Sequence, residues 1–296
     1  MTDFETSIFN KHIKQTQNKI LSRNYPDICD GLTEIERGVL YGLYELDQNN
    51  GKLINVAQVI GVVMGHYVPM GYSVLSSVIT RFSRIFKTQN YPLLSTEGIL
   101  SNAFESDDGS DFRNWKCNLS EYGHQLFSNI DDECVDYSVN FDGIFIPDSL
   151  PSAFPNLLCN GSKTIPGHEL CSVKKAIVAT IENPDITENE LAVILDKPKF
   201  ADSRILLEDD FSRYYSTGNQ DIRFHYPNNE EILIFQASNI VLDNNETRLV
   251  TTKEMIKAYI EYRKNILSRL YKKQNGKSIH KEELNKMLLE SINNIK

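Results

Sequence analysis

The spacing of apolar residues in the first third of the chain predicts a set of amphipathic helices. Their expected spans are residues 4–23, 33–46, 55–67 and 72–86. Tyr25-Pro26 ends the first of these, and Val68-Pro69-Met70-Gly71 forms a tight turn between the last two. Two helices joined by such a turn have the shape of a helix-turn-helix, which many helical hairpins without any DNA-binding role share.

The pattern changes beyond residue 91. It predicts short strands and one helix, residues 119–130, before residue 162, and then a helix over 172–181. Thr187 stands where an N-cap belongs, directly before the run ENELAVIL. Residues 200–250 alternate in short runs that are typical of antiparallel strands. The expected fold class is α+β.

The last segment, residues 251–296, is charged and has a helical pattern. An apolar stripe runs from Ile256 to Leu270, and Asn275-Gly276 interrupts it before a second helix that begins near His280. Two such helices suit pairing with another chain, and they suit equally well packing on the body of their own chain.

The composition is that of a soluble globular protein. The chain has 296 residues, of which 41% are hydrophobic, enough for a sizeable core. No apolar run approaches the roughly 20 residues of a membrane-spanning helix, and the first residues lack the features of a signal peptide. We therefore expect a cytoplasmic protein without a membrane partner. The net charge of −9 argues against strong nonspecific binding to nucleic acid and leaves room only for a local basic patch.

The cysteines and histidines form no metal-binding pattern. The five cysteines are odd in number and lack CxxC spacing, and the six histidines include no HExxH motif. The sequence predicts reduced, mostly buried thiols, with no disulfide framework, no metal site and no cofactor.

Six blocks of sequence between residues 25 and 187 carry a family resemblance. They are YPDICDGLTEIERGVLYGLYEL (25–46), GHYVPMGYS (65–73), VDYSVNFDG (135–143), LPSAFPNLLCNGS (150–162), IPGHEL (165–170) and ENPDIT (182–187). In this order they resemble the A subunit of type IIA DNA topoisomerases, the gyrase A and topoisomerase IV group. The resemblance covers residues 20–190, and residues 253–270 are similar to the start of that family's coiled-coil.

The resemblance implies a domain organisation. The expected parts are an N-terminal helical arm (1–24), a winged-helix domain of the DNA-gate type (25–160), a reduced tower-like domain (161–250) and short C-terminal coiled-coil helices (251–296). The tower is expected to be reduced because fewer than 70 residues separate ENPDIT from the start of the coiled-coil. The family's dimer gate and a magnesium-binding domain are expected to be missing from this chain.

The resemblance also implies a place for the catalytic nucleophile. In the family a tyrosine that directly follows an arginine attacks a DNA phosphodiester, assisted by positive charge and metal ions. The matching pair here is Arg113-Asn114, and an amide has no ionisable oxygen for this attack. Tyr122 lies eight residues further along a predicted helix, about 12 Å along its axis, too far to substitute. The sequence therefore predicts a pseudoenzyme, in which Trp115 is a packing residue.

Other positions that contact DNA in the family differ as well. Val68 and Met70 stand in place of two histidines, so the degenerate site comprises Arg113, Asn114, Val68 and Met70. Residues 54–58 lack the family's basic run, Thr33 replaces a lysine and Gly38 replaces an arginine. Only Lys163-Thr164 remains of a glycine-rich loop that inserts a residue between DNA bases. The positions that shape the fold are kept, whereas those that contact phosphate are lost.

Five side chains are retained as candidates for DNA binding. They are Arg23, Arg37, Ser73, Arg81 and Arg113. Each arginine is equally well explained as a solvated or ion-paired surface residue, whereas a basic face built from Arg37, Arg81, Arg84 and Lys87 would favour DNA docking.

This pattern favours an interaction protein over an enzyme. The expected partner is a second copy, bound through the winged-helix face, or a topoisomerase subunit that the chain modulates. The alternative is a protein that binds duplex DNA weakly without cleaving it. An active enzyme completed by a partner's tyrosine is disfavoured, because the basic surroundings of the nucleophile are missing too.

Overall fold

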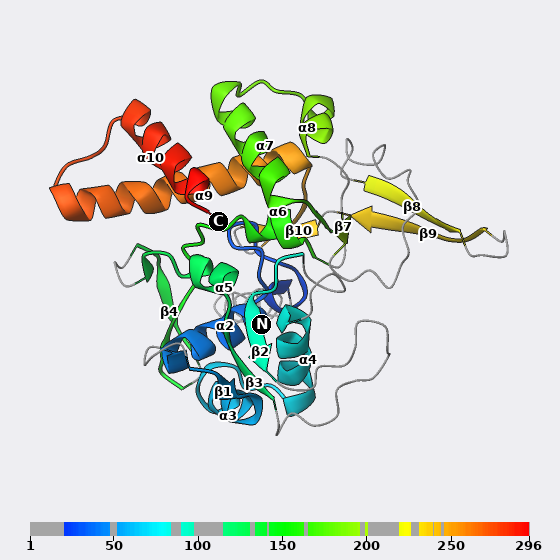
Figure 1. The fold of residues 1–296 in the computed structure, drawn as a ribbon, viewed down its shortest axis with the longest axis vertical. Coiled ribbons are helices and arrows are strands. Elements are labelled where there is room, and N and C mark those ends of the chain that lie inside the picture. Colours follow the sequence, from blue (N-terminus) through cyan, green and yellow to red (C-terminus); the bar gives the residue numbers. More distant parts are fainter. Residues whose placement is uncertain are drawn as a thin grey trace, which may run out of the picture.

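The computed structural model describes most of the chain after residue 20 (Figure 1). The described residues are 21–47, 52–83, 90–97, 115–130, 134–140, 142–162, 165–195, 199–200, 219–225, 231–238, 240–243 and 246–295. The predicted first helix falls almost entirely outside them. So do Arg113, Asn114, Arg84, Lys87 and Lys163-Thr164.

Helices and a small antiparallel sheet make up one end of the molecule, the lower end in Figure 1. The helices are α2 (Glu34–Asp47), α3 (Val56–Val62), the π-helix η1 (Val63–Tyr67) and α4 (Tyr72–Ser83). The sheet has the order β1-β3-β2 and consists of β1 (Ile54–Asn55), β2 (Leu94–Glu97) and β3 (Lys116–Leu119). The Asn55 side chain caps α3 by accepting from the amide of Ala57. The helices predicted over 33–46 and 55–67 are confirmed, and so is the one predicted over 72–86 as far as Ser83, because residues 84–86 lie outside the described part of the chain.

Short elements connect this end to the opposite one. They are α5 (Glu121–Leu126), β4 (Tyr137–Val139), β5 (Phe145–Pro147), α6 (Asn156–Asn160) and β6 (Pro166–Gly167). The helix predicted over 119–130 is shorter than expected, because Ser120 caps it at one end and Asn129 adopts a positive φ of 68° beyond the other. β4 and β5 form an antiparallel hairpin in which Val139 lies opposite Phe145.

The remaining elements form the upper part of Figure 1. They are α7 (Leu170–Glu182), α8 (Glu188–Ile194), β7 (Lys199–Phe200), β8 (Asn219–His225), β9 (Glu231–Ser238), β10 (Ile240–Asp243), β11 (Glu246–Leu249), α9 (Thr252–Asn275) and α10 (Lys281–Asn293). The capping box at Thr187 and Glu190 confirms the predicted start of α8. The strands predicted within 200–250 are confirmed as two antiparallel pairs, β8 with β9 and β10 with β11.

The C-terminal helices fold back on their own chain. Gly276 ends α9 in the left-handed conformation, with φ 68°, as the interruption at Asn275-Gly276 predicted. α10 packs against α9 and α7 through Leu288 and Ile292, which are fully buried. Of the two arrangements that the sequence left open, the structure has the one in which these helices lie on their own body.

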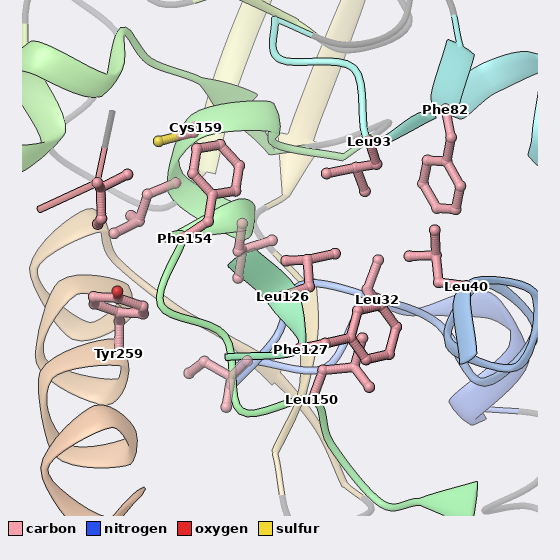
Figure 2. Packing of buried hydrophobic residues seen from close by; sticks show 14 of the residues in the cluster. Leu32, Leu40, Phe82, Leu93, Leu126, Phe127, Leu150, Phe154, Cys159 and Tyr259 are labelled. Atoms are coloured by element: carbon pink, nitrogen blue, oxygen red, sulfur yellow. The ribbon is translucent and has the colours of Figure 1, made fainter. Parts of the chain in front are cut away.

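One hydrophobic cluster joins the two ends of the molecule. Figure 2 shows Leu40 of α2 and Phe82 of α4 on one side of this core and Tyr259 of α9 on the other, with Phe154 between them. Trp115 is 2% exposed and belongs to the same cluster, which confirms its predicted role in packing. Cys117, Cys134 and Cys159 are buried thiols, whereas Cys171 is exposed.

No single helix among the described residues is long and apolar enough to cross a membrane. The helices Val56–Tyr67 and Tyr72–Ser83, which are bent by 119° to each other, have the length and composition of a membrane span only when they are counted together.

Candidate functional site

The turn between η1 and α4 contains Val68 and Met70, two positions of the predicted degenerate site. Val68 is 7% exposed and Met70 packs against the core, so both side chains face the protein interior. Around this turn the side chains of Met64, Tyr72, Ser73 and Val74 are exposed. We call these four residues the helix-turn face. None of the four carries a charge, although His66 on the same helix as Met64 is also exposed and lies against Asp142.

Two glycines of α2 let this turn approach closely. A Cβ atom added to Gly38 would lie 2.2 Å from Cγ2 of Val68. One helical turn further on, a Cβ on Gly42 would lie 2.8 Å from both Val63 and Tyr67. The family resemblance presents Gly38 only as a lost cation, whereas the structure shows that Val68 fills the space above it. An arginine at position 38 requires that Val68 move.

Thr33 and Glu36 stabilise the start of α2. The Thr33 amide donates to Oε2 of Glu36 over 2.9 Å, and the Glu36 amide donates to Oγ1 of Thr33 over 3.4 Å. This reciprocal pair is the pattern of a capping box. Thr33, which the resemblance presents as a missing lysine, therefore has a local structural role.

Arg81, a predicted DNA-binding residue, forms an ion pair inside the protein. Its Nη2 pairs with Oε1 of Glu36, which joins α4 to the start of α2, and the guanidinium lies 5.0 Å from the ring centre of Phe82. The Arg81 side chain is 25% exposed and that of Glu36 is 9% exposed. Glu36 thus offsets the charge of Arg81 near the helix-turn face.

Arg37, a second predicted DNA-binding residue, is buried in an ion pair with Asp30. Nε of Arg37 donates to Oδ2 of Asp30 over 2.7 Å, and Nη2 donates to Oδ1 over 3.1 Å. The amides of Leu32 and Leu150 also donate to this carboxylate, whose side chain is fully buried. Burial opposes the charged form of Arg37, but Asp30 outweighs it and raises the arginine pKa. Asp30 therefore joins Arg37 of α2 to Leu150 in the segment before α6.

A buried amide ladder explains the block LPSAFPNLLCNGS. Nδ2 of Asn156 donates to the carbonyl of Asp30 over 3.1 Å, and Nδ2 of Asn160 donates to Oδ1 of Asn156 over 2.9 Å. Asn160 also exchanges hydrogen bonds with the backbone of Tyr91. Gly31, with φ +71°, lies so close to the Leu157 backbone that a Cβ would approach its amide to 2.7 Å. The blocks at 25–46 and 150–162 therefore contact each other in the protein interior through these hydrogen bonds and this close approach. The sequence alone did not reveal that contact.

The other predicted site residues are not brought together. Arg23 and Ser73 are exposed, and their proposed role in binding DNA stays a prediction. Arg113 lies outside the described residues. Tyr122 packs edge-on against Tyr91 and at a tilt against Phe154, with ring centroids 4.9 and 5.1 Å away, and burial raises its pKa. Tyr122 is a packing residue in this structure.

The β4–β5 hairpin adds exposed apolar surface and is tied to η1. Nδ1 of His66 lies 2.9 Å from Oδ2 of Asp142, and the Asn140 side chain donates to the His66 carbonyl. The opposed pair Val139 and Phe145 on this hairpin is 58% and 62% exposed. Among the described residues, the largest exposed apolar side chains at this end therefore lie on η1, on α4 and on a hairpin fastened to η1.

Comparison with known proteins gives a consistent match. The family model for the A subunit of DNA gyrase/topoisomerase IV matches residues 23–236. The DNA gyrase A subunit of Kosmotoga olearia is 31% identical over 210 residues, 67% of this chain and 26% of that protein. The Staphylococcus epidermidis protein of the same name is 32% identical over 215 residues, 69% of this chain and 24% of the relative. The DNA gyrase A subunit of Buchnera aphidicola is 27% identical over 267 residues, which are 84% of this chain and 32% of that protein. The chain spans about a quarter to a third of the length of these relatives.

These relatives overturn one expectation from the sequence. They are named as subunits of DNA gyrase, and gyrase is an enzyme. The prediction that the chain is not an enzyme was therefore wrong. It depended on Asn114, which lies outside the described residues, and on the loss of several phosphate-contacting positions. These substitutions do not outweigh a match over most of the chain.

Proposed function

Because the chain belongs to the family of DNA gyrase and topoisomerase IV A subunits, we propose that it acts as an A-subunit-like protein that associates with a second A-type protein. The partner is another copy of the chain or a subunit of a topoisomerase, whose activity the association modulates. One observation carries this proposal: around the helix-turn face the exposed side chains are mostly apolar while Arg37 and Arg81 pair internally. Apolar surface next to paired cations suits a protein partner better than a phosphate backbone.

The proposal includes the domain organisation that the family implies. Helices α2 to α4 and the sheet β1-β3-β2 support a winged-helix domain over 25–160. The paired strands β8 to β11 support a small tower-like domain over 161–250, and the helices α9 and α10 support a short coiled-coil segment over 251–296.

The association is tested by placing charge on the helix-turn face. Met64 and Tyr72 are 42% and 46% exposed, so Met64→Glu and Tyr72→Glu add charge without disturbing the core. Val193 on α8, 85% exposed, provides the matched control Val193→Glu. Each protein is measured by light scattering after gel filtration, without a partner and with the purified A protein of gyrase. We expect the Met64→Glu/Tyr72→Glu variant to lose self-association or complex formation and Val193→Glu to keep it. A wild-type chain that stays monomeric and leaves the gyrase protein unbound contradicts the proposal.

A second candidate function is binding of duplex DNA by the same face. The exposed Ser73 favours it, because it lies in the first turn of α4, a helix whose free amides attract phosphate. Ser73→Glu should then weaken binding in a gel shift at low salt, whereas Ser128→Glu, a partly buried serine of the segment after α5, should not. If no shift appears at low salt, this function is excluded.

A further inference from the structure

The distal end of the α9–α10 pair has a charge opposite to that of the rest of the chain. Between Lys264 and Lys281 the sequence holds six lysines and arginines and no aspartate or glutamate. The segment contributes +6 to a chain of net charge −9, so the remaining residues carry −15. We call these cations the basic tip: Lys264, Arg269, Lys272, Lys273, Lys277 and Lys281.

The basic tip lies on ordered, exposed structure. Lys272 and Lys273 are in the last turn of α9, Lys277 is in the loop after Gly276, and Lys281 begins α10. These four lysines are all exposed. In Figure 1 the tip projects at the upper left, at the far end of the molecule from α3 and the helix-turn face. The tip is therefore a surface separate from the one discussed above.

Helix stability accounts for only part of this charge. Lys272 and Lys273 interact favourably with the C-terminal end of the α9 dipole. The same effect favours acids at the start of α10, where Glu282 and Glu283 stand, and it disfavours Lys281 there. Lys281 also lies close enough to Lys264 to lower the pKa of that lysine, after burial as the larger cause. The fold thus brings like charges together at the tip, an arrangement that a bound anion would relieve.

The tip lacks the apolar surface of a protein interface. The exposed large apolar side chains in the described part of the chain lie on η1, α4, β4, β5, α8 and β11, and none lies between Lys264 and Lys281. Protein interfaces need a buried core enriched in aromatic and apolar groups. A phosphate backbone needs only cations at its surface, and lysines contact it without reading base sequence.

We propose that the basic tip binds the phosphate backbone of duplex DNA, independently of sequence and of the helix-turn face. The acidic remainder of the chain weakens this attraction little, because charges beyond a Debye length of about 8 Å are screened at physiological salt. Release of counterions from the duplex drives the binding, which is therefore steeply dependent on salt.

Fluorescence anisotropy of a labelled mixed-sequence duplex, titrated with the full chain over a salt series, tests this proposal. The tip variant is Lys272→Gln/Lys273→Gln/Lys277→Gln. Its control, Lys116→Gln/Lys175→Gln/Lys257→Gln, removes the same charge from exposed lysines elsewhere. We expect the tip variant to bind at least about tenfold more weakly at low salt and its slope of log K against log salt to fall by about 3, one for each contact. The control should lose much less.

Three outcomes overturn the proposal. They are a wild-type chain that does not bind duplex at low salt, equal losses in the tip and control variants, and competition by polyglutamate as effective as that by unlabelled duplex of equal charge. The last outcome assigns the tip to an acidic protein. Circular dichroism melts verify that the variants are folded, because glutamine keeps helix propensity. Loss of self-association in the Met64→Glu/Tyr72→Glu variant leaves this measurement unaffected, so the two proposals fail separately.

Discussion

In α2 and α4 Arg37 and Arg81 are held in ion pairs with Asp30 and Glu36, whereas at the basic tip Lys272 and Lys277 are exposed to solvent. The family resemblance drew attention to the first group of cations, because it made them candidates for DNA binding. The structure shows that packing withdraws those side chains and leaves a different group exposed. A cation in a family motif is thus evidence for a phosphate contact only when its partners inside the fold are known.

Two arginine–aspartate pairs, one buried and one exposed, are expected to differ in how much they contribute to stability. The Arg37–Asp30 pair is buried, with side chains 11% and 0% exposed. Arg269, the one arginine of the basic tip, forms a pair with Asp136 that has two hydrogen bonds of 3.2 Å but is 50% and 76% exposed. Removing one partner of a buried pair leaves an uncompensated charge, whereas water replaces the partner of an exposed one.

The largest effect is therefore expected from Asp30→Ala. This substitution leaves the buried Arg37 guanidinium without its carboxylate and removes the acceptor of the Leu32 and Leu150 amides. We expect the free energy of unfolding to fall by about 3–5 kcal/mol, measured by urea denaturation. Asp136→Ala is the control and should cost less than about 1 kcal/mol. Equal effects of the two substitutions would contradict the distinction between the two pairs.

The second expected effect concerns the pH dependence of Asp27, which neighbours Asp30, Arg37 and Cys29. Burial and then the charge of Asp30 raise the pKa of Asp27 from 3.8 to about 6. The folded state therefore holds a proton on Asp27 that the unfolded chain releases between about pH 4 and 6. This group's stabilising contribution is full below pH 4 and is lost as the pH rises through 6.

Asp27→Asn removes the stability loss that comes from ionising Asp27. It keeps an oxygen that can accept from the Cys29 amide, as Oδ1 of Asp27 does over 2.8 Å. At pH 7 the variant should be more stable than the wild type by up to about 3 kcal/mol, and the difference should vanish below about pH 4. Thermal melts of both proteins between pH 4 and 8 measure it. A constant difference across this range would show that Asp27 is not the titrating group.

The third effect tests the close packing of Gly38 on Val68. Gly38→Ala places a Cβ where the structure leaves 2.2 Å to Cγ2 of Val68, so we expect a loss of about 1–3 kcal/mol despite the better helix propensity of alanine. Val68→Ala should open the space, and the double variant should recover at least about 0.5 kcal/mol relative to additivity. Gly61, which has nothing within 4 Å of its added Cβ, provides the control Gly61→Ala. If the stability losses of the two single variants simply add in the double variant, the proposed contact between positions 38 and 68 is contradicted.

The smallest effect is expected at the basic tip. Lys281→Gln relieves the repulsion of Lys264 and should raise the free energy of unfolding by a few tenths of a kcal/mol at low salt. The gain should disappear at high salt, where the repulsion is screened. Lys286→Gln, an exposed lysine further along α10, is the control. A gain that persists at high salt would point to helix propensity as its cause.

Local signals predicted much of the fold. Helix α2, the capping box at Thr187, the break at Gly276 and the buried Trp115 were all expected from neighbouring residues. The site was less predictable. Gly38 was interpreted as a lost cation, because nothing nearby in sequence shows that Val68 fills the space over it. Thr33 was interpreted in the same way, although Thr33 and Glu36 have the local spacing of a capping box.

The sequence by itself determined the family of this protein and the boundaries of most of its helices. Caps, turns and apolar periodicity act over a few residues, so they can be recognised along the chain. Only the tertiary structure decided which cations are exposed. Arg81 pairs with Glu36 across 45 residues, and Asp30, which pairs with Arg37, also accepts from the amide of Leu150 across 120. An ion pair formed over such distances depends on how the elements pack, and no local pattern encodes it.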